Sequence, residues 1–334
     1  MLLRRSRVRD RIGADTARSL VPVVAAVIAL GIGYVVPLAS PLLIALVLGA
    51  AVGNTRLGAH RLLSGQQRVT KVLLRVGVVL LGLRLPLQDL ASVGVPGLAV
   101  IGVTVVATFT LTCYVGDRLG LERGIVTLIA AGFSICGASA IAAVESGVRR
   151  RDEDVALSIA MVTIFGTSMI VVIPLLGGVL GMDALQIGIW AGASIHEVAQ
   201  VVAAASMAGA AAVAIATTIK LGRVSLLAVA YLAAQRRERS GAAVPRDASA
   251  PLVPWFVVGF VAAAAIRSTG VIGPGVLGVA DVATTVLLAG AMFGLGLMMR
   301  LRSLLPVPWR VFVLSAASTA IAATVSLGLT LALF

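Results

Sequence analysis

The chain has 334 residues, of which 59% are hydrophobic and only 12% are charged, and its mean hydropathy is +1.07. Soluble domains carry about 25% charged residues, so this composition excludes a water-soluble globular fold. The net charge of +13 does not indicate nucleic-acid binding, because arginines cluster at the ends of apolar segments, as they do in membrane proteins. We expect membrane lipid, and no nucleic acid, as a partner.

Long stretches without a charged residue follow one another along the chain, from residues 19–55 to residues 311–334. Runs of roughly 18 or more apolar residues are long enough to span a bilayer as helices. Continuous apolar runs do not fit the alternating pattern of a membrane β-barrel. The sequence therefore predicts an all-α integral membrane protein with about 9–11 transmembrane helices. The expected spans lie near residues 19–36, 41–54, 69–90, 95–116, 122–145, 155–180, 184–207, 211–232, 252–268, 281–299 and 310–333.

A basic segment precedes the first span, with arginines from Arg4 to Arg18. The positive-inside rule predicts that residues 1–18 form a cytoplasmic N-terminus. The first apolar stretch is too long for a cleaved signal peptide. Residues 19–334 are expected to form a single transmembrane domain, with a polar cytoplasmic loop near residues 235–250. The expected location is the bacterial cytoplasmic (inner) membrane, which the chain would cross several times.

The charged loop at residues 149–154 (RRRDED) conflicts with a topology of eleven simple spans, which would place it outside the cell. If residues 122–145 and 184–207 instead re-enter the membrane from opposite faces, the loop returns to the cytoplasm. Both topologies remain open at the level of sequence. Residues 131–144 and 191–204 share the pattern Ala-Gly-x-Ser-Ile, and residues 72–90 resemble residues 286–304. Weak internal repeats of this kind are typical of transporters. For residues 72–90 and 286–304, a chance match between apolar helices is an equally supported alternative.

The segment Gly132-Phe-Ser-Ile-Cys-Gly-Ala-Ser139 lies in the middle of a charge-free stretch. A helix interrupted here would direct free backbone N–H groups at the bilayer midplane, where they favour an anion. The alternative is a face of small residues that lets helices pack closely. We expect Ser134, Cys136, Gly137 and Ser139 to contribute to a substrate site.

A second unusual segment, residues 192–200, carries His196, Glu197 and Gln200 between apolar stretches. Ionisable residues inside a membrane are costly and usually line a transport pathway. The sequence therefore predicts that His196 and Glu197 couple a proton and that Gln200 contributes to substrate binding. The alternative is a buried pair that ties helices together. No metal site is expected, because the segment lacks the second histidine of an HExxH motif.

Lys220 and Arg223 follow the charge-free stretch 198–219 and are expected to lie inside the bundle. There they would attract an anionic substrate, and the planar guanidinium suits an oxyanion. The alternative is that these side chains extend to the lipid headgroups. For Arg84 the two interpretations are equally supported.

Several of these strings together resemble a known family. They are Gly53-Asn54, LRVGVVLLGLRL (residues 74–85), SICGASAIAA (134–143), IHEVAQVVAA (195–204) and KLGRV (220–224). With them the chain resembles the YeiH-type family of proposed sulfate exporters (UPF0324-like) over nearly its whole length. The resemblance implies a panel-and-core fold with inverted repeats and broken helices, as in bile-acid symporters and cation–proton antiporters. It also allows a homodimer.

The expected function is secondary transport, in the outward direction, of a small inorganic or sulfur-containing anion such as sulfate or sulfite, coupled to protons. The sequence shows no nucleotide motif, metal cluster or nucleophile triad, so neither an enzyme nor a cofactor is expected. The nearest alternative is a cation–proton antiporter that uses Glu197. A passive channel and a membrane-embedded sensor are more distant alternatives.

Overall fold

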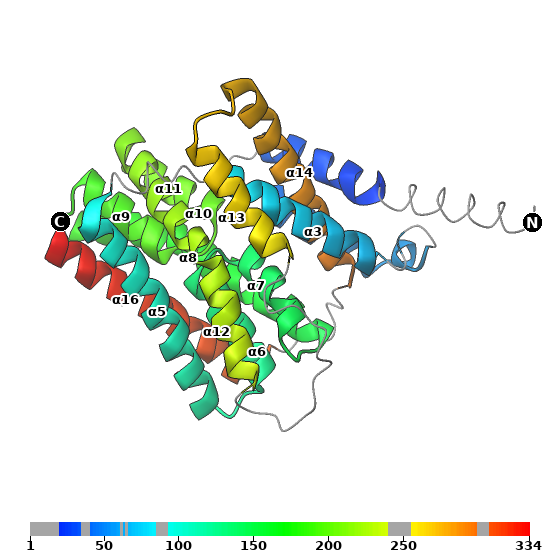
Figure 1. The fold of residues 1–334 in the computed structure, drawn as a ribbon. Coiled ribbons are helices and arrows are strands. Elements are labelled where there is room, and N and C mark those ends of the chain that lie inside the picture. Colours follow the sequence, from blue (N-terminus) through cyan, green and yellow to red (C-terminus); the bar gives the residue numbers. More distant parts are fainter. Residues whose placement is uncertain are drawn as a thin grey trace, which may run out of the picture.

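A computed structural model of the chain describes residues 20–34, 41–60, 63, 66–84, 93–239, 255–298 and 307–334. The described secondary structure is helical throughout (Figure 1), as the sequence predicted. The basic N-terminus and residues 240–250 of the predicted polar loop lie outside the described residues.

The outer surface of the bundle is apolar. Side chains such as Val106, Val171 and Val258, in the middle of long helices, are more than half exposed. Exposed apolar side chains along long apolar helices are typical of a surface that faces lipid. Four described helices are long and apolar enough to cross a bilayer, a bent pair would make a fifth, and four further apolar helices are shorter. The protein is therefore a multi-pass membrane protein.

The helices form two bodies, which we call the panel and the core. In the panel, α14 lies against α2 and α3, and α13 lies against α3. The panel comprises helix Leu20–Tyr34, α2 (Pro41–Gly53), α3 (Gln67–Leu81) with the 3-10 turn η2 (Gly82–Arg84), α13 (Trp255–Ser268) and α14 (Pro274–Met298). A short 3-10 turn, η1 (Arg56–Ala59), follows α2.

Close approach of α2 and α14 holds the panel together. A Cβ atom on Gly49 would lie 2.1 Å from the Phe293 carbonyl oxygen, so only glycine fits at this crossing. Small residues at such positions let membrane helices pack backbone against backbone.

The core contains the remaining helices. Its main contacts join α9 to α11, α5 to α16 and α5 to α6. The core comprises α5 (Gly94–Arg118), α6 (Arg123–Ser134), α7 (Ala138–Val144) with the 3-10 turn η3 (Glu145–Gly147), α8 (Asp152–Val179), α9 (Ala184–Ser194), α10 (Val198–Ser206), α11 (Ala210–Ser225), α12 (Leu227–Arg239) and α16 (Trp309–Leu333). Panel and core meet mainly where α3 lies against α7 and α14 lies against α8. We call this interface the seam (Figure 1).

The first predicted re-entrant segment, α6 with α7, begins and ends at the same face of the bundle. A Cβ atom on Gly124, at the start of α6, would lie 2.0 Å from the carbonyl oxygen of Arg149, which follows α7. The side chains of Glu122 and Arg151 also approach to 4.0 Å. A helix of the length of α6 rises about 18 Å, little more than half of a hydrocarbon core of about 30 Å. The segment therefore enters the membrane and returns.

The second segment, α9 with α10, re-enters from the opposite face. Gly188 and Gly192 of α9 contact Ala212 and Ala216 of α11 in the same order, so α9 and α11 run parallel. Since α11 begins directly after α10 ends, α9 also begins at the face where α10 ends. The structure thus favours the topology with two re-entrant segments over eleven simple spans.

We call the face that carries the 118–123 and 149–151 loops the basic face. The end of α12 also reaches it, because Arg237 forms an ion pair with Asp117 and the Arg149 backbone N–H donates to Glu238 at 3.4 Å. The predicted span 211–232 is formed by two helices, α11 and α12, bent by 40° at Leu226. The charged loop at residues 149–154 therefore lies on the same face as the end of α12.

The first prediction concerns orientation. If the basic face is cytoplasmic, a cysteine introduced by Glu153→Cys, in the exposed first turn of α8, will resist a membrane-impermeant maleimide in intact cells and react after permeabilisation. Val271→Cys replaces an 84% exposed side chain in the turn between α13 and α14; it serves as the control and will react in intact cells. Both native cysteines are buried and contribute little background. If Glu153→Cys reacts in intact cells and Val271→Cys does not, the basic face lies outside the cell.

Candidate functional site

The first helix break lies between α6 and α7, in the segment that the sequence analysis singled out. Gly137 adopts φ +70° and ψ −130°, which side-chain-bearing residues rarely adopt, and its N–H donates to the Gly132 carbonyl at 2.9 Å. A Cβ atom on Gly137 would lie 2.7 Å from Cγ of Glu197. Glycine is therefore required here both by the backbone conformation and by the neighbouring side chain.

The second break lies between α9 and α10. Ile195 and Glu197 are extended (φ/ψ −66°/149° and −113°/149°) and flank His196. The Glu197 backbone N–H donates to the Gln200 side-chain oxygen at 3.2 Å, which caps the start of α10. The two broken helices predicted from the sequence are therefore present, and they contact each other through Gly137 and Glu197.

Two buried cations connect the breaks. Lys220 Nζ donates to the carbonyl oxygens of Ile135 at 2.9 Å and Ile195 at 2.6 Å. Arg223 donates to Ser134 at 3.1 Å, Phe133 at 2.8 Å and Ile195 at 3.1 Å. Both side chains are completely buried. They satisfy carbonyls that the ends of α6 and α9 leave free and offset the negative ends of both helix dipoles.

A cavity of about 330 Å³ lies in the seam beside these breaks; we call it the central cavity. Its core wall consists of Cys136, Ala138, Ser139, Glu197, Val198 and Val224. Its panel wall consists of Pro41, Leu42, Leu81, Arg84, Asp281, Thr285 and Leu288.

Polar groups from both helix breaks reach the central cavity. The Glu197 carboxylate lies near the Ala138 backbone N–H at the start of α7. Ser139 Oγ lies 2.7 Å from Cys136 Sγ and donates to the Cys136 carbonyl at 3.2 Å. A carboxylate, a hydroxyl and a thiol are therefore available to a bound solute.

The panel wall adds a charged group that sequence reasoning did not assemble. Arg84 forms an ion pair with Asp281 and also donates to the Asp281 carbonyl at 2.7 Å and to Thr285 Oγ1 at 2.6 Å. These contacts hold Arg84 against α14 at the panel wall of the central cavity. Asp281 and Thr285 were missed, although an aspartate just before an apolar stretch was the signal that could have identified them.

Several predicted site residues do not line the central cavity. The His196 ring lies 4.4 Å from the Phe133 ring and its Nε2 is 3.2 Å from Thr319 Oγ1, inside the core. Gln200 Nε2 donates to Thr167 at 3.3 Å, and Ser134 Oγ donates to the Ala131 carbonyl. His196 and Glu197, which were predicted to act together, therefore face different surroundings. Only Glu197 faces the central cavity.

Lys220 and Arg223 also lie behind the cavity wall, and their donors are engaged by backbone carbonyls. They contribute positive charge to the region but reach no described cavity that could hold a substrate. No cluster of three His, Cys, Asp or Glu side chains suited to a metal ion occurs in the described part of the chain.

These features define a multi-pass α-helical membrane protein built around two opposed broken helices, with a cavity between two helical bodies that is lined by both apolar and polar side chains. The family described as conserved hypothetical protein 698 matches residues 17–315, and the chain belongs to it. No solved structure matches the chain.

Relatives named UPF0324 membrane protein are similar over most of the chain. One from Corynebacterium glutamicum is 39% identical over 92% of this chain and 90% of its own length. One from Pseudomonas aeruginosa is 42% identical over 77% and 76%, and one from Bacillus cereus is 38% identical over 77% and 72%. The resemblance to the UPF0324 family noted in the sequence is thereby confirmed.

The second prediction separates a structural from a substrate-binding role of Lys220. Lys220→Met will lower the thermal unfolding midpoint of the detergent-purified protein, because two buried carbonyls lose charged hydrogen bonds worth about 1.5–3 kcal/mol each. Lys71→Met, at the chain's other and exposed lysine, is the control and will leave the midpoint unchanged. Equal midpoints for both variants would contradict the structural role.

Proposed function

We propose that the protein is a secondary transporter of a small anion such as sulfate or sulfite, and that the anion binds in the central cavity. The observation that carries this proposal is the cavity itself. It lies between two helical bodies and beside two broken helices, and Ser139 and Glu197 face Arg84 across it. Discontinuous helices that meet near the midplane are the usual solute sites of secondary transporters.

The contacts between panel and core support alternating access. Helices within each body pack extensively, whereas the two bodies meet mainly through α3 with α7 and α14 with α8. A relative movement of the two bodies would therefore break few contacts within either one. Transporters of this type work largely by such rigid-body movement around a fixed site.

Glu197 is the proposed proton-coupling group. Its ionised carboxylate occupies the polar core wall, next to Ser139 and the Ala138 N–H, and would repel an anion. Protonation removes that charge and adds a donor hydroxyl. Asp281 is held by Arg84 on the opposite wall, and Lys220 lies behind the break. Anion and proton would therefore bind together and move in the same direction.

This coupling still permits export of a divalent anion. Sulfate accompanied by one proton carries one net negative charge, and each elementary charge gains about 2.3 kcal/mol per 100 mV. The interior-negative potential of a bacterial cytoplasmic membrane drives such a charge outward. We accordingly propose that location, with the basic face and the N-terminus in the cytoplasm.

A cation–proton antiporter is the second candidate, and a specific observation favours it. Two carboxylates, Glu197 and Asp281, line the central cavity, and carboxylate oxygens are preferred ligands of hard cations. In that case protons and cations would compete for Glu197, so the two would move in opposite directions. A channel would instead show conductance far above the turnover of a carrier.

The third prediction tests the coupling. In proteoliposomes, sulfate or sulfite flux through the wild type will rise when the pH falls on the side from which the anion moves, and an imposed proton gradient will drive anion accumulation. Glu197→Gln removes the titrating charge but keeps the shape, so flux will no longer respond to the gradient.

Glu153→Gln, at an exposed position, is the matched control and will behave as the wild type. Proton flux that depends on sodium or potassium and does not respond to anions would contradict anion transport and support the cation–proton antiporter. Gradient-driven accumulation by Glu197→Gln would assign the coupling to another group.

The fourth prediction concerns Ser139. Ser139→Ala removes a hydroxyl from the core wall of the cavity and will raise the substrate concentration for half-maximal flux about two- to tenfold, since such a contact contributes about 0.5–1.5 kcal/mol. Ser168→Ala, which removes an exposed hydroxyl bonded within α8, will leave the substrate concentration for half-maximal flux unchanged. Unaltered transport by both variants would mean that the segment serves only helix packing.

A further inference from the structure

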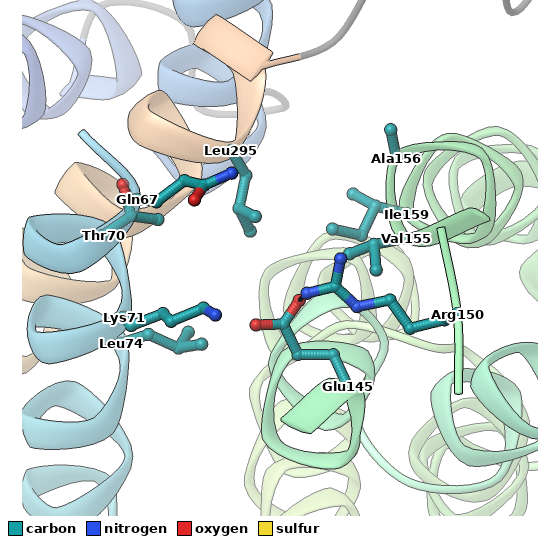
Figure 2. Close-up of a pocket in the computed structure, with 10 residues that line it drawn as sticks. All are labelled: Gln67, Thr70, Lys71, Leu74, Glu145, Arg150, Val155, Ala156, Ile159 and Leu295. Carbon is teal, nitrogen blue, oxygen red and sulfur yellow. Dashed lines mark hydrogen bonds and ion pairs between the residues drawn. The ribbon is translucent and has the colours of Figure 1, made fainter. Parts of the chain in front are cut away.

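A second cavity, of about 270 Å³, lies in the seam near the basic face; we call it the cleft (Figure 2). Lys71, Gln67 and Thr70 of α3 form its panel wall, and Glu145 and Arg150 belong to its core wall. It is separate from the central cavity, with which it shares no lining residue.

The two cavities lie at opposite ends of the same contact between α3 and α7. Ser139, in the first turn of α7, lines the central cavity, whereas Glu145, directly after α7, lines the cleft. On the panel side, Leu81 lines the former and Leu74 the latter. A solute that moves along the seam from the basic face would meet the cleft before the central cavity.

The charges of the cleft come from both bodies. Glu145 is only 6% exposed and accepts a hydrogen bond from Arg150 Nη2 at 2.9 Å. Lys71 extends from α3 toward the same carboxylate (Figure 2), but no ion pair joins Lys71 to any described residue. Among the described residues that line it, the cleft therefore holds two cations and one carboxylate, which together carry a net positive charge.

We propose that the cleft is a second anion-binding site, which takes a small soluble oxyanion of the sulfate or phosphate type from the solution at the basic face. Lys71 and Arg150 bind the anion from opposite walls, because ammonium and guanidinium groups both pair well with oxyanions. The Glu145 carboxylate pairs with Arg150 when the anion is absent, and it therefore competes with the anion for Arg150. The inference that this anion is the transported substrate rests on the proposed function; the binding site itself does not.

The test measures occupancy of the cleft directly. Ala156→Cys places a thiol in the lining of the cleft, and its reaction with maleimide is followed in the detergent-purified full chain by mass spectrometry. Sodium sulfate, titrated at constant ionic strength against sodium chloride, will slow the reaction. The sulfate concentration that gives half-maximal protection is the quantity compared among variants.

Three further variants are made in this background. Lys71→Gln will raise the half-protection concentration about fivefold, in the range of a partly exposed charge pair. Glu145→Gln will lower it, because the competing carboxylate loses its charge. Arg68→Gln, which removes an exposed charge from the same helix outside the cleft, is the matched control and will leave it unchanged.

Three results would overturn the proposal. The first is absence of protection by sulfate, sulfite and phosphate. The second is an equal effect of Lys71→Gln and Arg68→Gln. The third is protection by phosphatidylglycerol micelles without protection by sulfate, which would assign the cleft to a lipid headgroup.

The same measurement separates this proposal from the proposed function. Glu197→Gln changes the central cavity and its coupling but will leave protection in the cleft intact. Anion-independent transport with intact protection would remove the proposed function and keep the site. Sulfate transport without protection of the cleft would contradict the second anion site and leave the proposed function intact.

Discussion

The rest of the structure depends on how two interrupted helices are made stable inside a membrane. In lipid, every carbonyl freed by a helix break must find a donor within the protein. Lys220 and Arg223, from two successive turns of α11, supply donors to the ends of both α6 and α9. One helix thus fixes both re-entrant segments relative to each other, and both breaks are held at the same place in the bundle.

That arrangement decides which polar groups remain available. The carbonyls of the breaks are engaged by α11 on one side, so the side chains of Cys136, Ser139 and Glu197 are left facing the panel on the other. Gly137 makes this possible, because any Cβ there would displace Glu197. The polar groups in the core wall of the central cavity are therefore a consequence of how the breaks are supported.

The seam brings polar groups of both bodies together. Arg84 and Asp281 come from the panel, whereas Glu197 and Ser139 come from the core, so any relative movement of the bodies changes what the cavity contains. The cleft repeats this division, with Lys71 on the panel and Arg150 on the core. Charged groups from both bodies therefore lie at both ends of the contact between α3 and α7.

The sequence by itself determined the fold class and the approximate positions of the apolar segments, because apolar run length is a local property. It also marked the segments around Gly137 and Glu197 as unusual, but only the tertiary structure decided between spanning and re-entrant segments. Tertiary structure alone decided the roles of individual side chains. His196 and Glu197 are adjacent in sequence, yet the extended backbone between α9 and α10 directs only Glu197 to the cavity. Lys220 was expected to face a substrate, but its ammonium is held by carbonyls of two other helices. Arg84 and Asp281 are far apart in the chain and meet only because α3 and α14 pack antiparallel. Spacing along one helix does not encode such contacts, which form only when separate helices are brought together.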